Sequence, residues 1–545
     1  MGMINSPGVY SAFLVIFEAE RLAFRLFMAA LCIHLLRAAW HARPRPLATP
    51  KPLNDDRRAH WPFVTVQLPL RNEVYVAERV MRAVAAMDYP RDRMEIQVID
   101  TSTDQTIVIV DRVAQDLRAK GALVEVIRGT ASIGNKGGSL ALGLKTAKGE
   151  FIAVFDADCV PRPDFLRRAL PFFDERVGLV QGRGSFLNGE ASLLTRVQAL
   201  LLDALMLVDQ TARSRLGSTF QFNGSGGVWR RACIDEAGGW RSSSITEDLE
   251  LSCSALLGGW RFIHEASIDV PTEVPEDILA FRAQQRRWTR GGMHVLRTLA
   301  RRVVASDAPL SCRIGVIVHL VRKVLYVLLA ILTITYPLTT FSIVQPLIRY
   351  SVPSDALLFV AVISSIAVYL LQGRRLAGRG ALKGAVLVPF AIACSFGMSF
   401  THAVALLRGL FHTDAEFERT PKFGGSSKVG AERRYRSRIE MAAFLELAIG
   451  AAYVAFSLRA FGMHLYLHAS FMTFVAMSYL WVGIMTLIAI VRTLRAARNE
   501  RAKSSVCRPP LSPPLVEGEA PSASLPAAPA LTPEIHPRPT SSPPR

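Results

Sequence analysis

The stretch FIAVFDAD at residues 151–158 is a short apolar run that ends in two aspartates separated by one residue. An apolar run of this length predicts a β-strand buried in a sheet. Further β-rich runs occur at 64–68, 95–100, 124–128 and 179–183, and segments with helical periodicity, such as 73–87 and 106–120, lie between them. Strands that alternate with helices at this spacing predict an α/β fold with a Rossmann-like, mostly parallel sheet.

Acidic side chains follow two of the predicted strands. Asp100 ends the run EIQVID, and Asp156 ends the run FIAVFD. Ligands of parallel sheets bind beyond the carboxyl ends of the strands, so we expect both residues at a ligand-binding edge. The sequence contains no Walker loop, no G-x-G-x-x-G after a strand, no H-E-x-x-H and no G-x-S-x-G. The absence of these motifs argues against a P-loop ATPase, a dinucleotide-dependent oxidoreductase, a zincin and a serine hydrolase.

The composition predicts a membrane protein. The chain has 545 residues, 50% of them hydrophobic and 20% charged, and its mean hydropathy is +0.26. This combination indicates long apolar segments beside a polar domain, and it excludes a fully disordered or a purely soluble protein. The net charge of +19 would also suit nucleic-acid binding. Because the basic residues crowd around the apolar segments, we interpret them as membrane-flanking and expect no nucleic-acid partner.

Five apolar stretches are long enough to cross a lipid bilayer, which takes about 17 to 25 residues. They lie at 9–36, 314–344, 354–371, 439–461 and 469–491. A sixth stretch, 384–407, has basic loops on both sides, so we expect it to be re-entrant or interfacial, although a sixth span stays open. The basic loops place residues 37–313 in the cytoplasm. We therefore expect a multi-pass protein of the inner (plasma) membrane with five crossings.

The sequence predicts four parts of the chain. They are a transmembrane or interfacial helix with a linker (1–59), an α/β domain (60–300), transmembrane and interfacial helices (301–495) and a disordered tail (496–545). The tail prediction depends on the 12 of 31 prolines that fall within residues 505–545. The seven cysteines form no C-x-x-C pair, which favours a reducing compartment over a disulfide framework or a zinc knuckle.

Asp156 and Asp158 form a D-x-D motif at the end of the predicted strand. Two carboxylates in this position can hold a hard divalent cation, which would neutralise a diphosphate. A solvated turn would also account for a bare D-x-D, but the apolar strand before it favours a site. Asp100 can accept hydrogen bonds from a nucleobase or ribose. Alternatively it caps the next helix, a role that Ser102 and Asp104 fit at least as well.

Two further motifs precede helical segments. Asn135-Lys136-Gly137-Gly138 offers one lysine and free backbone N–H groups, which would cradle a phosphate, whereas the alternative is a plain glycine-rich turn. Thr246-Glu247-Asp248 opens the segment LELSCSALL. Thr246 as the N-cap and acids in the first turn would explain this triplet structurally. In the functional interpretation, Asp248 is a general base that removes a proton from an acceptor hydroxyl.

The segment QQRRW at residues 284–288 lies among basic residues before the membrane stretches. A guanidinium there could hold the phosphate of a leaving group, and the indole of Trp288 could stack on a sugar ring. The alternative is an amphipathic interfacial helix that tryptophan and arginine anchor at the membrane surface.

The order of these motifs resembles the processive family 2 glycosyltransferases, which include cellulose and hyaluronan synthases. The segments VTVQLPLRNE, YPRDRMEIQVID, KGGSLALGLK, FDADCVPRPDFL, FNGSGGVWR and ERTPKFG look like the cellulose-synthase-like mannan and glucomannan synthases. This resemblance covers about residues 15–495. It implies a GT-A fold for residues 60–300, a divalent cation (Mg²⁺ or Mn²⁺) and inverting transfer from a UDP- or GDP-hexose.

The resemblance also implies roles for matching positions. Asp248 would be the catalytic base, Asp100 would contact the nucleoside and Lys136 the diphosphate. Asp156 and Asp158 would serve the diphosphate–metal centre, with Asp158 the more direct metal ligand. The remaining substrate contacts would come from Glu247, Gln284, Arg287 and Trp288, and the loop 222–227 would lie close to the acceptor.

Three hypotheses follow. The first is a membrane glycosyltransferase that extends a glycan acceptor, a β-linked mannan, glucomannan or glucan, and exports it through its own helices. The second is a non-processive enzyme that glycosylates a membrane lipid, as ceramide glucosyltransferases do. The third is a non-catalytic membrane component that binds nucleotide or scaffolds partners.

Two positions depart from the family pattern. Asp100-Thr101 replaces the paired acids usual in mannan-synthase relatives, and residues 180–184 lack an aromatic that often follows the arginine. The nucleoside and the polymer therefore stay open.

Overall fold

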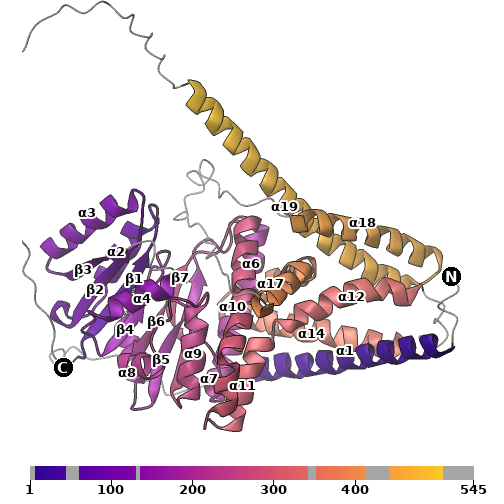
Figure 1. Ribbon diagram of the computed structural model, residues 1–545, viewed down its shortest axis with the longest axis horizontal. Coiled ribbons are helices and arrows are strands. Elements are labelled where there is room, and N and C mark those ends of the chain that lie inside the picture. Colours follow the sequence, from indigo (N-terminus) through magenta and orange to yellow (C-terminus); the bar gives the residue numbers. More distant parts are fainter. Residues whose placement is uncertain (1–6, 45–60, 130–134, 342–351, 412–440, 507–545) are drawn as a thin grey trace, which may run out of the picture. The chain divides into compact units, whose positions relative to one another are not determined.

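The computed structural model describes residues 7–44, 61–129, 135–341, 352–411 and 441–506. Among these residues, seven strands form one sheet in the order β3-β2-β1-β4-β6-β5-β7 (Figure 1). The strands are β1 (Val64–Leu70), β2 (Met94–Asp100), β3 (Leu123–Arg128), β4 (Phe151–Val154), β5 (Val177–Phe186), β6 (Gly227–Arg230) and β7 (Arg261–Thr272). Only β6 runs antiparallel to its neighbours, β4 and β5. The predicted mostly parallel sheet is therefore confirmed.

The strands that the sequence predicted are short runs rich in apolar and β-branched residues, although β1 and β2 also contain polar residues such as Gln67 and Gln97. β2 and β4 are buried along their whole length, as expected for central parallel strands covered on both faces. The sequence analysis missed β6 and β7. β6 has four residues and follows a glycine-rich loop, and β7 alternates apolar residues with His264, Glu265 and Asp269. Neither strand has an uninterrupted apolar run like that of β4.

Helices cover both faces of the sheet and complete an α/β/α sandwich (Figure 1). One layer consists of α2 (Ala77–Ala85), α3 (Thr106–Ala119) and α5 (Phe165–Ala169), whose apolar residues join the larger core cluster of the sheet. The other layer consists of α4 (Lys136–Leu144), α8 (Arg231–Glu236) and α9 (Glu247–Leu257), which pack around Trp229 and Phe262. The helices expected at 73–87 and 106–120 correspond to α2 and α3.

A set of apolar helices makes up much of the remaining chain. They are α1 (Pro7–His41), α11 (Leu310–Val321), α12 (Val324–Thr340), α14 (Val352–Leu376), α15 (Ala381–Ala385), α16 (Val388–Gly397), α17 (Ser399–Phe411), α18 (Met441–Gly462) and α19 (Tyr466–Val506). Among the described residues, four helices are long and apolar enough to cross a membrane, or up to six if each of two bent pairs is one span.

Both bent pairs fall on stretches that the sequence singled out. The predicted span 314–344 is broken between α11 and α12, which meet at 45°, and the predicted re-entrant stretch 384–407 is broken before α17 by 47°. The number of crossings stays a prediction. α19 continues to Val506, beyond the predicted boundary at 496, and the rest of the proline-rich tail lies outside the described residues. The chain divides into two compact units, 1–496 and 497–545.

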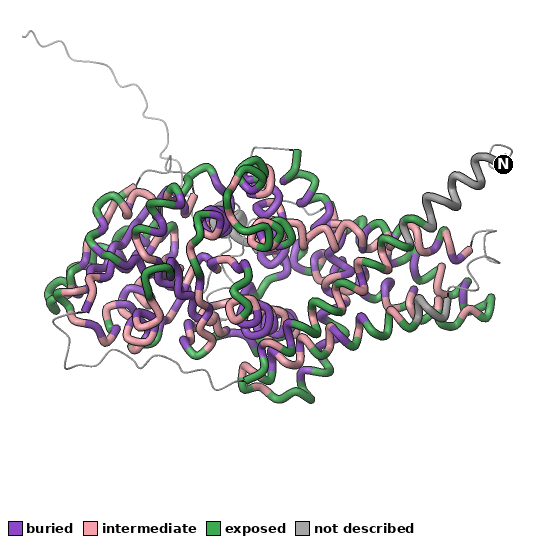
Figure 2. The backbone as a smooth tube through the Cα atoms, turned by 90° about the horizontal axis from the view of Figure 1, so that it is seen from below, coloured by how far each residue is buried: buried purple, intermediate pink, exposed green. Residues whose placement is uncertain are grey.

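Exposed residues recur along several of these helices (Figure 2), and large apolar side chains are among them. Leu26 on α1, Leu338 on α12, Leu357 on α14 and Leu458 on α18 are each exposed by more than half. Water-soluble monomers rarely expose apolar surface on this scale, so these faces suit contact with lipid. The opposite faces of α12, α14, α18 and α19 share one buried cluster with α16.

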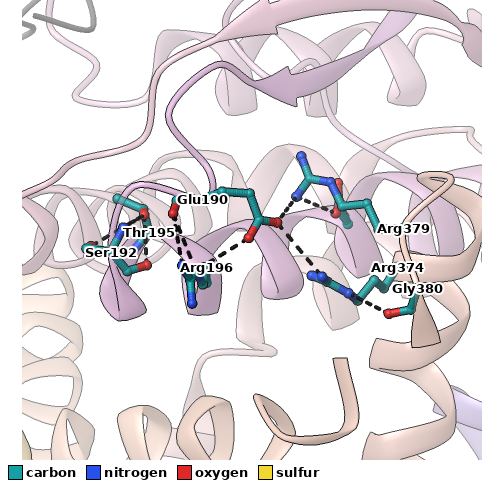
Figure 3. Close-up of polar contacts among 8 residues, drawn as sticks. Glu190, Ser192, Thr195, Arg196, Arg374, Arg379 and Gly380 are labelled. Carbon is teal, nitrogen blue, oxygen red and sulfur yellow. Dashed lines mark hydrogen bonds and ion pairs between the residues drawn. The ribbon is translucent and has the colours of Figure 1, made fainter. Parts of the chain in front are cut away.

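Four further elements lie between the sheet and the apolar helices. They are α6 (Leu193–Ala204), the π-helical turn η5 (Leu205–Gln210), α7 (Thr211–Arg215) and α10 (Ile278–Ala305). At the start of α6, the Glu190 carboxylate lies 3.8 Å from Arg374 Nη2 and 3.7 Å from Arg379 Nη1 (Figure 3). Arg374 also donates from Nε to the carbonyl of Gly380. These contacts tie the end of α14 to the α/β domain.

Candidate active site

A cavity of about 290 Å³ opens at the carboxyl ends of β1 and β4. The chain proceeds from β1 outward to β2 and β3 on one side and places β4 on the other, so the cavity lies at a topological switch point of the sheet. The predicted site residues that line this cavity are Lys136, Asp156, Asp158, Glu247, Asp248, Gln284, Arg287 and Trp288. They come from the start of α4, the end of β4, the start of α9 and the middle of α10.

Asp100 is the predicted site residue that does not line the cavity. Its side chain is fully buried at the end of β2, where it forms an ion pair with Arg128 and accepts a hydrogen bond from the Ser102 N–H at 2.9 Å. The next residue, Thr101, lines the cavity instead. Asp104 accepts a hydrogen bond from Thr106 N–H at 2.9 Å just before α3, whereas the N-cap residue of that helix is Gln105 and makes no side-chain capping bond. A nucleoside contact by Asp100 would require its carboxylate to leave Arg128.

Lys136 connects two walls of the cavity. Its Nζ donates to Asp156 Oδ1 at 2.6 Å and to the carbonyl of Gly224 at 2.6 Å. Asn135 is the N-cap of α4 and accepts a hydrogen bond from Gly138 N–H at 3.3 Å, so one of the helix's free N–H groups is already bonded. The lysine cation therefore lies between the D-x-D motif and the loop that precedes β6.

The D-x-D carboxylates have different surroundings. Asp156 is half-buried beside Lys136, and its backbone N–H donates to Ser225 Oγ at 2.9 Å. Asp158 is buried, and its Oδ2 accepts from Thr272 Oγ1 at 2.9 Å. These bonds fix both carboxylates on the cavity wall at the end of β4.

The donor set fits a divalent cation that a substrate completes. Among the described residues there is no group of three or more His, Cys, Asp or Glu side chains that could hold a metal ion alone. Asp156 and Asp158 nevertheless supply the hard oxygen donors that Mg²⁺ and Mn²⁺ prefer. Mg²⁺ in phosphate-transferring sites is typically held by one or two carboxylates together with substrate phosphates. Two carboxylates at the wall of a diphosphate-sized cavity match that pattern.

The loop 222–227 approaches the start of α9. Gly224 has φ +81°, and a Cβ there would lie 3.1 Å from Asp248 Oδ2. Asn223 exchanges two hydrogen bonds with Gln210 of η5, at 2.6 and 3.0 Å, and its N–H donates to Gln181 at 3.0 Å. The π-helical turn and β5 thus hold this loop against Asp248.

The triplet Thr246-Glu247-Asp248 starts α9, as the sequence predicted, with Thr246 at the N-cap position. The Thr246 side chain makes no capping hydrogen bond. Instead, Asp248 Oδ1 accepts from Leu249 N–H at 2.8 Å, and the Asp248 carbonyl accepts from Ser252 Oγ at 2.6 Å. Capping by threonine therefore does not explain the triplet, and Asp248 keeps Oδ2 toward Gly224 and the cavity.

Electrostatic interactions in the cavity raise the pKa values of both carboxyl groups of the triplet. Burial and the negative charge of Asp248 raise the pKa of Glu247 to about 7, although Lys136 opposes this shift. Burial also raises the pKa of Asp248, again against Lys136. Burial alone would lower the pKa of Lys136, but the charges of Asp156 and Glu247 outweigh it, so the pKa is raised and the amine stays cationic. A carboxylate poised in this way suits general-base work.

α10 supplies the wall opposite the sheet. Arg287 and Trp288 lie three and four residues after Gln284, on the same face of this helix, and all three are partly buried where they line the cavity. The positive charge of Arg287 opposes the rise in the pKa values of Glu247 and Asp248, so the guanidinium acts on the same carboxylates as Lys136. α10 thus contributes a cation, an indole and an amide to the cavity that the D-x-D motif also lines.

The sequence analysis assigned no role to several cavity residues. They are Arg71 and Glu73 beyond β1, Thr101 beyond β2, and Thr272 and Glu273 beyond β7. Arg71 and Glu73 belong to the quoted segment VTVQLPLRNE, and Thr101 directly follows Asp100, so their place beyond the carboxyl ends of β1 and β2 could have identified them. Thr272 and Glu273 depend on β7, which was not predicted. The quoted segment ERTPKFG (418–424) lies outside the described residues.

Comparisons with known proteins agree on one family. The family "Glycosyl transferase family 2" matches residues 65–233, and "Glycosyl transferase family group 2" matches residues 151–372. The chain is similar to glucomannan 4-beta-mannosyltransferase 7 of Arabidopsis thaliana, at 30% identity over 417 residues that cover 72% of this chain and 71% of that protein. It is also similar to the probable glucomannan 4-beta-mannosyltransferase 7 of Oryza sativa subsp. japonica, at 38% identity over 281 residues covering 50% of this chain.

The chain spans about half the length of several curated relatives that it matches, for example 48% of the Oryza protein. Among solved structures, it is similar to a mannosyltransferase from Pyrobaculum calidifontis in complex with GDP-Man and Mn²⁺, at 20% identity and a TM-score of 0.45. That match covers 72% of this chain and 99% of the other.

Proposed function

The chain belongs to glycosyltransferase family 2, in its cellulose-synthase-like branch, and on this premise we propose that it is an inverting hexosyltransferase of a membrane. The predicted GT-A fold is confirmed by the family and by the seven-stranded mixed sheet. The proposed reaction transfers a hexose from a UDP- or GDP-sugar to a growing β-linked polysaccharide of the mannan, glucomannan or glucan type. The observation that carries this proposal is that Lys136, Asp156, Asp158, Asp248, Arg287 and Trp288 line one cavity.

The donor is proposed to bind along the carboxyl edge of the sheet. The nucleoside would lie beyond β1 and β2, beside Arg71 and Thr101, and the diphosphate would lie between Lys136 and Arg287. Asp156 and Asp158 would hold a divalent cation, Mg²⁺ or Mn²⁺, which would neutralise charge on the leaving diphosphate. Lys136 and Arg287 would also stabilise the negative charge of the leaving diphosphate.

Asp248 is proposed as the catalytic base. The acceptor hydroxyl oxygen attacks the anomeric carbon as the bond from that carbon to the diphosphate breaks, and the hydroxyl proton passes to Asp248. One in-line displacement inverts the anomeric centre, so one carboxylate base is sufficient. Burial would raise the pKa of this base, and the nearby Gly224 leaves room for the incoming hydroxyl.

The residues on the proposed acceptor side of the cavity support a glycan as the acceptor substrate. Trp288 offers an aromatic face, and Gln284 and Asn223 offer amide groups to sugar hydroxyls, all on the wall that α10 and the loop 222–227 form. α10 also packs against α17, and four or more helices of the chain are able to span a membrane. We infer that the polymer leaves through these helices and that the α/β domain lies on the cytoplasmic side of the inner (plasma) membrane. The basic residues next to the apolar stretches support this orientation.

The proposal is tested by incubating the full-length protein in isolated membranes with a panel of UDP- and GDP-hexoses and either Mg²⁺ or Mn²⁺. A β-linked polymer that resists organic extraction, formed from one donor and absent with chelator, is the expected product. A lipid-soluble glycoside would replace the polymerase proposal with the non-processive alternative. Failure to use any activated sugar with either cation would overturn the proposed function.

A further inference from the structure

The position of the proposed base depends on contacts between α10 and the start of α9. Gly291 of α10 lies directly against Thr246, because a Cβ built at Gly291 would lie 2.6 Å from Thr246 Oγ1 and in still closer contact with its Cγ2. No side chain larger than hydrogen fits between the two elements at this point. The neighbouring Gly292 is different, since a Cβ there would meet only the carbonyl oxygen of Leu320, at an ordinary 3.8 Å.

The segment that leads into the triplet Thr246-Glu247-Asp248 is also packed closely against a glycine, in this case on α4. A Cβ at Gly137 of α4 would lie 2.5 Å from the carbonyl of Arg241 and 2.9 Å from Glu247 Cβ, and Asn135 donates from its side chain to the carbonyl of Ser244. The segment from Arg241 to Glu247 is therefore enclosed between α4 and α10 by backbone contacts at two glycines.

Hydrogen bonds do not provide an alternative means of fixing Thr246. Its hydroxyl is buried and makes no hydrogen bond within the described residues, and the same holds for the hydroxyl of Ser244. Packing against Gly291 therefore contributes to the placement of this N-cap residue of α9. Asp248 follows two residues later, so a displacement of Thr246 moves the base.

α10 is itself anchored among the apolar helices. Arg282 is fully buried and donates from Nη1 to both carboxylate oxygens of Glu446 on α18, at 2.8 and 2.9 Å. Its Nη2 donates to Thr401 of α17 at 2.7 Å. A Cβ at Gly409 of α17 would lie 2.5 Å from the carbonyl of Arg290, one residue before Gly291. α17 and α18 therefore fix α10 at Arg282, and α17 also fixes it at Arg290, the residue before Gly291.

We propose that Gly291 is a positioning residue, through which the placement of α10 against the apolar helices sets the position of Asp248 in the cavity. This inference rests on the proposed function, because it takes Asp248 as the base. A side chain at Gly291 would push the start of α9 away by about 1 Å, and a misplacement of that size at a catalytic group costs about 100-fold in rate. Nucleotide binding should persist through Lys136 and the D-x-D motif, which lie on other elements, and through Arg287, which lies four residues before Gly291 on the anchored helix α10.

The test compares Gly291→Ala with Gly292→Ala in the full-length protein, which adds the same methyl group to the same helix one residue apart. We expect Gly291→Ala to lower kcat by about 10- to 100-fold. The KM for the sugar nucleotide, the affinity for UDP or GDP and the thermal midpoint should stay close to those of Gly292→Ala. Gly292→Ala should keep near wild-type turnover.

A double variant distinguishes positioning from general damage to the fold. Thr246→Ala removes the two side-chain atoms nearest to Gly291, so Gly291→Ala/Thr246→Ala should recover part of the turnover that Gly291→Ala loses. Equal turnover of the two glycine variants, or a double variant no more active than Gly291→Ala, would overturn the inference. A wild-type protein that uses no sugar nucleotide would instead overturn the proposed function, so the two failures are distinguishable.

Discussion

The amine of Lys136 donates a 2.6 Å hydrogen bond to Asp156 Oδ1, so that the first residue of α4 meets the carboxyl end of β4 inside the cavity. The same amine donates to the carbonyl of Gly224, which a positive φ places beside Asp248. One cation is thus shared by the proposed metal-binding carboxylate and the loop next to the proposed base. The charge of each of these groups therefore affects the protonation of the others and their affinity for a ligand in the cavity.

Lys136→Met should weaken nucleotide binding. A charge-assisted hydrogen bond to phosphate contributes about 1.5 to 3 kcal/mol, which corresponds to an increase of about 10- to 100-fold in the dissociation constant for UDP or GDP. Calorimetry with the purified protein measures this change. Lys145→Met, which removes an exposed amine just after the same helix, is the matched control and should bind nucleotide normally.

Asp248→Asn should abolish transfer while donor binding survives, because the base acts after the donor has bound. We expect turnover to fall by about 100- to 10,000-fold, the usual contribution of a general base. Asp235→Asn, an exposed change on α8, serves as the control. If the Asp248 variant also lost affinity for the sugar nucleotide, Asp248 would have a metal-binding or structural role instead.

The acidic limb of the pH profile should report the Glu247–Asp248 pair. Burial raises both pKa values, that of Glu247 to about 7, so the pair of carboxylates takes up its first proton as the pH falls through about 7. The value of kcat/KM should therefore decrease below neutral pH. In Glu247→Gln only Asp248 remains to take up a proton, so the acidic limb should move to lower pH. An unchanged limb in this variant would show that Glu247 does not influence the base.

Trp288→Ala should impair use of the glycan acceptor more than hydrolysis of the donor. The indole lines the cavity on α10, away from the strand ends that would hold the nucleotide. Its removal takes away a stacking surface for a sugar ring and leaves the proposed metal carboxylates in place. Rates of polymer extension and of sugar release to water, measured on the same preparation, separate the two effects. Equal losses of both rates would contradict an acceptor-stacking role.

The sequence predicted those parts of the fold in which residue pattern and burial coincide. β1, β2 and β4 are buried almost throughout because helices cover both their faces, and the uninterrupted apolar run of β4 made the acids that follow it stand out. β6 and β7 were missed because a four-residue strand and a mixed polar strand have no such run. Their absence from the prediction also hid Thr272, which bonds Asp158.

The candidate site was predicted from the order of motifs, but its internal contacts were not. Nothing in the sequence showed that Asp100 would pair with Arg128 instead of facing the cavity, since that depends on the register between β2 and β3. The contact between Gly291 and Thr246 was equally hidden, because it joins a helix interior to a helix start far away in sequence. Tertiary packing decides both.

The buried ion pair between Arg282 and Glu446 leads to a prediction about stability. Both side chains are fully buried, and the guanidinium also bonds Thr401 and approaches Thr486 Oγ1 at 3.4 Å. Glu446→Leu leaves the arginine charge without its partner, and such a loss costs about 3 to 5 kcal/mol in buried pairs.

Arg282→Met/Glu446→Leu replaces both charges by apolar groups, which is often neutral or stabilising. The thermal midpoint in detergent should therefore fall in the single variant and recover in the double variant. A double variant as unstable as the single one would mean that the pair is favourable in itself, so that α10 depends on the charges as well as on packing for its place among α17, α18 and α19.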